Sequence, residues 1–308
     1  MRAFIFPGQG SQAVGMGAAL ADASRAARDV FDEVDEALGQ NLSRLMREGP
    51  EDELKLTENA QPAIMANSIA VLRAWGINLA DHADFVAGHS LGEYSALCAA
   101  GSFDLATTAK LLKLRGQAMQ QAVPVGQGAM AALLGADLEL AKKIADTAAQ
   151  GEVCTVANDN DPTQVVISGH KGAIDRAIEL AKEMGAKRAL PLPVSAPFHC
   201  PLMQPAADAM ADALSYVVAR APTVPLYANV TAQSETDPDT IRNQLVEQVT
   251  GMVRWRESVA NMAAAGVDEF VELGGKVLAG MVKRIAPDVK VISVVTIEDI
   301  EALAKEIA

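Results

Sequence analysis

The sequence predicts an α/β protein whose mainly parallel sheet is interrupted by a smaller unit with its own organisation. Short apolar segments alternate with longer helical segments up to residue 125 and again after residue 197. Strands that alternate with helices are typical of a parallel sheet covered on both faces. Between these two parts the order of the segments changes. We therefore expect a large subdomain of residues 1–125 and 197–308 and a small subdomain of residues 126–196.

The elements of the large subdomain follow from apolar periodicity and from turn residues. In its first part we expect, in chain order, a strand at 3–6, a helix over about 13–35, helices that begin at 51 and 57, a strand at 85–87, and helices at 92–100 and 105–121. After the small subdomain, the apolar segments 224–229, 269–273 and 289–295 are expected to return to the same sheet.

The small subdomain lies between Pro124 and a run of prolines at 191, 193 and 197. Its expected elements are strands at 129–134, 153–157, 164–168 and 187–192 and helices at 138–149 and 172–184. The resulting βαββαβ order is that of a ferredoxin-like unit. We expect this unit to be an insertion, because strand and helix segments of the first kind resume after it.

Composition excludes several classes of protein. With 308 residues, 50% hydrophobic and 21% charged, the chain is typical of a globular protein. No apolar run approaches the roughly 20 residues that span a bilayer, and the N-terminus does not resemble a signal peptide, so we expect a cytoplasmic location. Its three cysteines lack metal-ligand spacing, which predicts neither a disulfide framework nor a metal site. The net charge of −13 argues against binding to nucleic acids or anionic membranes.

The segment Gly88-His89-Ser90-Leu91-Gly92 has the spacing of an exposed nucleophilic serine, the turn of α/β-hydrolase-like sheets. A strand is expected before it and a helix after it, which is the context that such a turn needs. The start of the helix adds free N–H groups, with that of Leu91 placed to bind an oxyanion. The alternative is a structural glycine turn. The context favours the nucleophile.

A serine nucleophile needs a base within hydrogen-bond distance, and the chain has four histidines. His89 is adjacent to Ser90 and is expected to point away from it, His82 is expected to be solvated, and His170 is expected to cap a helix. His199 lies in the loop Ser-Ala-Pro-Phe-His, where the small subdomain rejoins the large one and a cleft is expected. His199 is therefore the best placed of the four, and no acidic third member has a distinguishing context.

Three further features have ordinary interpretations from the residues alone. Gly-Gln-Gly-Ser-Gln-Ala at 8–13 fits a dinucleotide fingerprint, but the acidic residue expected after a second strand is missing, which leaves a tight loop presenting backbone N–H groups or Gln9. Arg115 is best interpreted as a solvated charge on an amphipathic helix, and Gln248 as a surface helix residue. Cys200 has no evident base of its own.

Taken together, the segments FPGQGSQ, GHSLGEYSAL, LRGQAM, GAMAALLG, SAPFH and KVLAGMVKRI occur in one characteristic order. In this respect the chain resembles the malonyl-CoA:acyl carrier protein transacylases, the stand-alone acyltransferases that load malonyl groups in bacterial type II fatty acid biosynthesis. The resemblance covers nearly the whole length. It departs from the family pattern in Gly274-Gly275, where a proline and one residue are lacking, and at Met252, where proline is common.

The resemblance implies a role for each candidate. Ser90 would be the acylated nucleophile and His199 the general base and acid, with the backbone carbonyl of Gln248 orienting the imidazole. The backbone N–H groups of Gln9 and Leu91 would form the oxyanion hole. Arg115 would hold the malonyl carboxylate, for which the planar guanidinium is suited. No cofactor is implied beyond the coenzyme A thioester that serves as substrate.

The implied partners are malonyl-CoA and acyl carrier protein, and we expect a monomer. Acyl carrier proteins are acidic and this chain is acidic too, so docking would need a local basic patch. The candidate residues are Lys182, Lys187, Arg188, Arg254, Arg256, Lys276, Lys283 and Arg284. Two alternatives are a thioesterase or other serine hydrolase, which would deliver the acyl group to water, and a non-catalytic carrier-binding protein.

Overall fold

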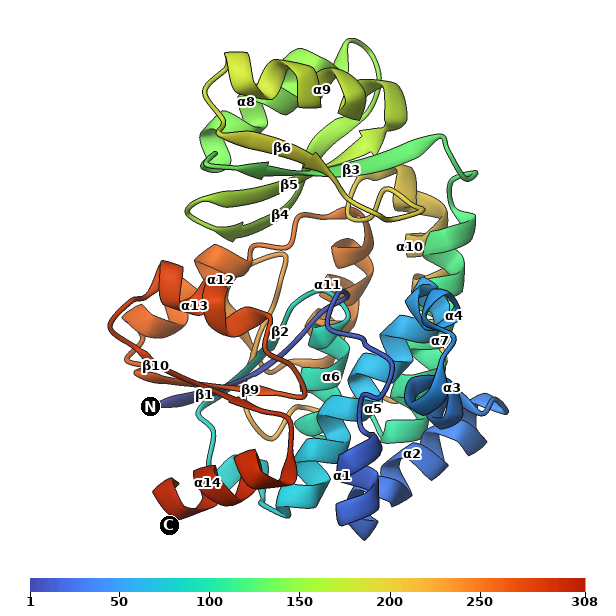
Figure 1. Cartoon of the computed structure of the whole chain (residues 1–308), viewed down its shortest axis with the longest axis vertical. Helices are drawn as coiled ribbons and strands as arrows, with labels where there is room; N and C mark the ends of the chain where they lie inside the picture. The colour runs from blue at the N-terminus through green and yellow to red at the C-terminus, as the bar shows by residue number, and fades with distance from the viewer. Residues whose placement is uncertain (308) are drawn as a thin grey trace.

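The computed structural model describes residues 1–307 and contains two separate sheets (Figure 1). The six-stranded sheet has the order β10-β9-β1-β2-β7-β8, and the four-stranded sheet has the order β4-β5-β3-β6. The strands of the larger sheet are β1 (Arg2–Phe6), β2 (Phe85–Gly88), β7 (Leu226–Tyr227), β8 (Ser234–Glu235), β9 (Glu269–Leu273) and β10 (Lys290–Val294). The predicted α/β class is confirmed.

Both faces of the six-stranded sheet are covered because its central strands are apolar on both sides. All neighbouring strands from β10 to β7 run parallel, and β8 is an antiparallel edge strand. Along β1, Ala3 and Ile5 pack with Trp255 and Phe270 in one apolar cluster, whereas Phe4 belongs to the larger cluster on the other face. Figure 1 shows α12 and α13 on one side of this sheet and α5, α6 and α7 on the other.

The helices of the large part are α1 (Ala18–Ala23), α2 (Arg25–Leu38), α3 (Leu42–Glu48), α4 (Glu51–Lys55), α5 (Thr57–Trp75), α6 (Gly92–Ala99), α7 (Leu105–Gln121), α10 (Gln204–Ser215), α11 (Pro238–Thr250), α12 (Trp255–Ala264), α13 (Leu278–Ile285) and α14 (Ile297–Ile307). Two short 3₁₀ turns, η1 (Leu79–Asp81) and η2 (Pro201–Met203), complete this part. Among residues 1–307, no helix combines the length and the apolar character needed to cross a membrane.

Two helical regions of this part differ from the sequence expectations. The single helix over 13–35 is divided at Ser24, whose hydroxyl accepts the N–H of Ala27 and caps α2. Helix α3, which the sequence analysis did not predict, begins in the same way at Asn41, which accepts the N–H of Arg44. In both cases a short polar side chain decides where a helix begins.

The expected strand at 224–229 is reduced to the two residues of β7. Only Leu226 and Tyr227 pair with β2. Past them, the side chain of Asn229 replaces strand pairing, because its Nδ2 donates to the carbonyl of Gly88 at 2.7 Å and its Oδ1 accepts the N–H of Ser90 at 2.8 Å. The shortened strand therefore places an amide side chain at the end of β2.

The four-stranded sheet is formed by β3 (Gly128–Leu134), β4 (Cys154–Asp161), β5 (Gln164–His170) and β6 (Arg188–Pro191), all antiparallel. Helices α8 (Leu138–Ala149) and α9 (Lys171–Glu183) pack on one face around an apolar cluster of their own. The strand order is that of a ferredoxin-like unit. We retain residues 126–196 as the proposed bounds of the small subdomain.

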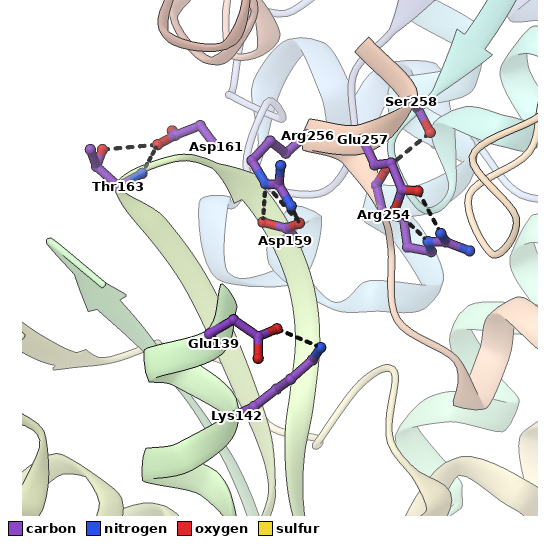
Figure 2. A network of polar contacts seen from close by, with 9 residues as sticks. All are labelled: Glu139, Lys142, Asp159, Asp161, Thr163, Arg254, Arg256, Glu257 and Ser258. Atoms are coloured by element: carbon purple, nitrogen blue, oxygen red, sulfur yellow. Dashed lines mark hydrogen bonds and ion pairs between the residues drawn. The ribbon is translucent and has the colours of Figure 1, made fainter. Parts of the chain in front are cut away.

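The C-terminal end of β4 ties the smaller sheet to the large part, as Figure 2 shows. Buried Asp159 pairs with Arg256 of α12, and buried Asp161 pairs with Arg284 of α13. Val253 forms two backbone hydrogen bonds with this strand, donating to Ala157 and accepting from Asp159. These contacts hold the two sheets in one arrangement above the end of β2.

Candidate active site

Ser90 lies in the turn between β2 and α6, at the end of the sheet that faces the four-stranded sheet. Its φ of 54° is in the left-handed region, a strained conformation for a residue with a side chain. The flanking glycines permit this turn: a Cβ on Gly88 would lie 1.9 Å from the backbone of Gly92, and one on Gly92 would lie 2.3 Å from the carbonyl oxygen of Phe6. The predicted strand–turn–helix context of Ser90 is confirmed.

His199 is the histidine that the fold brings to Ser90. Its Nε2 lies 2.8 Å from Ser90 Oγ, and its Nδ1 lies 2.8 Å from the backbone carbonyl oxygen of Gln248. Because a carbonyl can only accept, Nδ1 carries the proton and Nε2 presents its lone pair to the hydroxyl. Burial, reinforced by the nearby Arg115 cation, lowers the pKa of His199 to about 3. The imidazole is therefore neutral at neutral pH and can accept a proton.

The other three histidines lie elsewhere. His89 points away from Ser90, with Nε2 2.8 Å from Oδ1 of Asn160 on β4 and its ring edge-on to Trp255. His82 is half-buried beside Trp75 rather than fully solvated. His170 occupies the residue before α9 but does not cap the helix, because its Nδ1 accepts the N–H of Val153 across the hairpin. The expected capping role of His170 was wrong.

Arg115 is buried, with 1% of its surface exposed, and is not the solvated charge that its helical pattern suggested. Its Nη1 donates to Gln61 Oε1 at 2.7 Å, and its Nη2 donates to Gln248 Oε1 at 2.8 Å and to Ser90 Oγ at 3.2 Å. Its Nε is buried without a partner. Among the ion pairs of residues 1–307, none includes Arg115, so this buried cation has only neutral hydrogen-bond partners.

Gln248 is fully buried and connects the other members of the site. Besides the carbonyl contact to His199 and the amide contact to Arg115, its Nε2 donates to the Ser90 carbonyl at 3.0 Å and to Glu93 Oε2. From the residues alone Gln248 is predicted to be a surface helix residue, and that prediction is wrong. Its position depends on the packing of α11 against the nucleophile turn, which local periodicity does not show.

Three residues of this network were not found from the sequence: Gln61, Glu93 and Asn229. Gln61 gave the clearest available signal, since it is a polar residue inside the long apolar helix α5. Glu93 follows the nucleophile by one helical turn, and Asn229 lies in the segment that had been expected to be a strand. Each becomes recognisable only when the tertiary structure places it beside Arg115 or Ser90.

A cavity of about 350 Å³ opens onto Ser90, His199 and Arg115. Apolar side chains line much of it, among them Met119, Met130, Leu192 and Phe198. Gln9 and Leu91 also line the cavity, and in the described part of the chain their backbone N–H groups have no hydrogen-bond partner. The side chain of Gln9 is held by Thr57, whose hydroxyl donates to Gln9 Oε1. The two N–H groups are thus available to an oxygen atom bound beside Ser90.

Comparison with known proteins agrees with this geometry. The family model described as an acyl transferase domain matches residues 3–295. The malonyl CoA-acyl carrier protein transacylase of Escherichia coli K12 is 49% identical over 284 residues, 92% of each chain. The chain belongs to the malonyl-CoA:acyl carrier protein transacylase family. The crystal structure of the acyl-carrier-protein S-malonyltransferase of Bartonella henselae, 53% identical, covers 99% of this chain and 98% of its own with a TM-score of 0.97.

A further transacylase structure is a malonyl-transacylase in complex with its type II polyketide-synthase acyl carrier protein. It is 42% identical, with a TM-score of 0.96 and coverage of 99% of each chain. The fold of this chain is therefore shared by a transacylase that was solved with a carrier bound.

The two departures from the transacylase pattern leave the site geometry intact. With Met252 in place, the Gln248 carbonyl still accepts from His199. At Gly274-Gly275 the turn is held from α5, since Asn67 Nδ2 donates to the Gly274 carbonyl and Ser68 Oγ to the Leu273 carbonyl. Glu272 adds a cap to α13 by accepting backbone N–H groups of residues 277–279.

Cys200, next to His199, is buried. Its thiol donates to the carbonyl of Pro197 at 3.1 Å, and burial raises its pKa. A thiol in this state is a poor nucleophile. Cys200 contributes packing below the His199 loop.

Proposed function

We propose that this chain transfers the malonyl group of malonyl-CoA to the phosphopantetheine thiol of an acyl carrier protein through a malonyl-Ser90 ester. One observation carries the proposal: the guanidinium of Arg115, buried and without an anionic partner, lies beside the hydroxyl of Ser90. A carboxylate at the far end of a short acyl group supplies the missing anion. An acyl group without a carboxylate leaves the cation unpaired when the cavity closes over it.

The first half-reaction loads the serine. Ser90 Oγ attacks the thioester carbonyl while His199 Nε2 accepts the hydroxyl proton, and the Gln248 carbonyl bonded to Nδ1 holds the imidazolium that forms. The oxygen of the tetrahedral intermediate binds the N–H groups of Gln9 and Leu91. When the carbon–sulfur bond breaks, His199 returns the proton to the coenzyme A sulfur.

The second half-reaction reverses these roles with a different thiol. His199 accepts the proton of the phosphopantetheine thiol, whose sulfur attacks the malonyl ester carbonyl. The ester bond to Ser90 Oγ breaks, and His199 returns the proton to that oxygen. The products are malonyl-acyl carrier protein and free enzyme, as in a ping-pong mechanism.

The carrier is proposed from the transacylase that was solved with an acyl carrier protein. Three of the candidate docking residues, Arg254, Arg256 and Arg284, are engaged in ion pairs with Glu257, Asp159 and Asp161. Lys187 and Arg188, by contrast, are exposed and begin the segment that leads through β6 to Leu192 at the cavity. We favour this pair as the cationic part of the docking surface. The monomeric state and the cytoplasmic location stay predictions.

Intact-protein mass spectrometry tests the proposed function. Incubation with malonyl-CoA is expected to add one malonyl group to the protein and none to Ser90→Ala, whereas acetyl-CoA is expected to give far less loading. Efficient loading by acetyl-CoA, or loading that survives in Ser90→Ala, would contradict the proposal.

A further inference from the structure

Glu93 is a buried carboxyl group, 1% exposed, that the mechanism above does not use. Its Oε2 accepts from Gln248 Nε2 and, at 3.4 Å, from the backbone N–H of Asn229. Its Oε1 is buried with no partner. An ionised carboxylate with one unsatisfied buried oxygen is unfavourable unless a cation compensates for it.

Glu93 differs in this respect from the other buried acids of residues 1–307. Those acids are Asp159, Asp161, Glu269 and Glu272. The first three form ion pairs with arginines, and Glu272 accepts three backbone N–H groups. Glu93 has neither kind of compensation in the described structure. Its surroundings are those of a group that gains or loses a proton rather than those of a fixed anion.

The cation nearest to Glu93 in the hydrogen-bond network is Arg115. The amide of Gln248 lies between them, accepting from Arg115 Nη2 with Oε1 and donating to Glu93 Oε2 with Nε2. Arg115 therefore attracts the anionic form of Glu93 across one amide group. Among residues 1–307, Glu93 is the carboxyl group whose charge acts on the Arg115 cation.

We propose that in alkaline solution Glu93 becomes the counter-charge of Arg115 in the empty site and takes up a proton from solvent when a malonyl carboxylate binds to Arg115. This inference rests on the proposed function, because it assumes that Arg115 binds that carboxylate. Two carboxylates that share one buried cation repel each other, and protonation of Glu93 removes one of the two charges. Gln248 and Asn229 can remain donors to Glu93 in either state, so the network is kept.

The titration of the surrounding groups supports this assignment. Burial raises the pKa of Glu93 to about 8, while Gln248, Asn229 and Arg115 oppose the rise. The other titratable groups around Glu93 are Tyr94, His199 and His89. Burial raises the pKa of Tyr94 and lowers the pKa values of His199 and His89. Around pH 8 Glu93 is thus the group of this site that changes charge.

The consequence is a pH-dependent affinity for acyl groups that carry a carboxylate. Below about pH 7 Glu93 is protonated in both states, and binding takes up no proton. Above about pH 8 the empty site loses the proton and the loaded site keeps it, so the affinity for malonyl-CoA falls by up to about tenfold per pH unit. Acetyl-CoA, which has no carboxylate, is expected to bind with little pH dependence.

Titration calorimetry on Ser90→Ala tests the inference without acyl transfer or thiol release. Malonyl-CoA and acetyl-CoA are each bound at about pH 8.5 in buffers of different ionisation enthalpy, which gives the number of protons taken up. We expect more than half a proton per malonyl-CoA, close to none for acetyl-CoA, and close to none for malonyl-CoA in Ser90→Ala/Glu93→Gln. An unchanged proton count in the double variant would overturn the assignment to Glu93.

Two further arms keep the result interpretable. Ser90→Ala/Arg115→Ala should bind malonyl-CoA more weakly than Ser90→Ala. Undiminished affinity would overturn the proposed carboxylate site at Arg115, and with it the inference about Glu93. If a thermal melt shows that Glu93→Gln does not fold, the affinity of Ser90→Ala for malonyl-CoA is measured as a function of pH, and this pH dependence tests the inference. Equal affinity at about pH 7 and pH 9 would overturn the inference.

Discussion

The guanidinium of Arg115 lies within hydrogen-bond distance of the Ser90 hydroxyl, with Nη2 3.2 Å from Oγ. A fixed cation is thus part of the nucleophile's immediate surroundings. Helix α7 carries Arg115 and packs against α5, whose Gln61 fixes the orientation of the guanidinium. The Ser90 hydroxyl and this cation are therefore held in one connected set of hydrogen bonds.

Replacement of Arg115 should reduce selectivity together with rate. Arg115→Ala is expected to lower kcat/KM for malonyl-CoA by about 10²-fold or more, because a charge-assisted, two-pronged contact is lost. The preference for malonyl-CoA over acetyl-CoA should shrink as well. Arg115→Lys keeps the charge without the planar fork and should recover only part of the activity. A variant that retained the malonyl preference in a transfer assay would show that another group selects the carboxylate.

The acid side of the pH profile should lack the inflection of an ordinary histidine. Since burial and Arg115 lower the pKa of His199 to about 3, the base stays neutral well below its usual range. The rate of Ser90 loading should therefore be nearly flat from about pH 7.5 to pH 5. The burst of coenzyme A release, followed by rapid mixing, measures it, with fluorescence as a control for folding. A fall centred near pH 6.5 would contradict this assignment.

The lowered pKa of His199 also predicts how the free energy of unfolding depends on pH. Between about pH 6.5 and pH 3 the unfolded chain binds a proton at His199 that the folded protein does not bind. The stability contributed by a neutral His199 is therefore present above about pH 6.5 and lost as the pH falls toward 3. Denaturant unfolding of the protein and of His199→Gln should diverge in this window, with the variant losing less stability on acidification. Parallel pH dependence would contradict it.

The ion pairs at the end of β4 should matter more for stability than the exposed Glu139–Lys142 pair in Figure 2. Arg256→Ala leaves Asp159 buried and unpaired and should cost about 1–3 kcal/mol, less than a fully buried pair because Arg256 is partly exposed. Lys142→Ala, which breaks an exposed pair within α8, should cost less than about 0.5 kcal/mol. Chemical denaturation measures both, and equal losses would contradict the difference.

Carrier docking should depend on the exposed cations that begin β6. Lys187→Glu/Arg188→Glu is expected to raise KM for acyl carrier protein about tenfold while the loading of Ser90 from malonyl-CoA is unchanged. Lys142→Glu/Lys143→Glu makes the same change of charge on α8 and serves as the control. If both double variants behave alike, long-range charge and not a local surface governs the encounter.

Periodicity and turn chemistry predicted the parts of the fold that local sequence determines. Strand β9 and helix α7 have the predicted bounds. The four strands of the smaller sheet and the two helices that pack on it occur in the predicted order. Helix α3 was missed and strand β7 was predicted too long, because the side chains of Asn41 and Asn229 replace the backbone pattern there. The Asn41 cap is a local contact with the N–H of Arg44. Asn229, in contrast, contacts Gly88 and Ser90, which are distant in sequence.

The residues of the site also differ in whether local sequence can predict them. The Ser90 turn could be predicted because its glycines, strand and helix are all local. Arg115, on a helix that also carries the exposed Lys110, gave no local sign that it is buried. Glu93 was not recognised because it is an ordinary helix residue until the fold connects it to Arg115 through Gln248. Gln61 gave only the signal of a polar residue in an apolar helix.

The most direct test of the account is whether the acyl group waits on Ser90 for a thiol. The protein is loaded with malonyl-CoA, freed of coenzyme A, and followed by intact mass with and without holo acyl carrier protein. The account predicts that malonyl-Ser90 persists alone and is lost when the carrier is added, with the malonyl mass recovered on the carrier. Loss at the same rate without carrier, with free malonate as the product, would contradict it and assign the chain to the hydrolases.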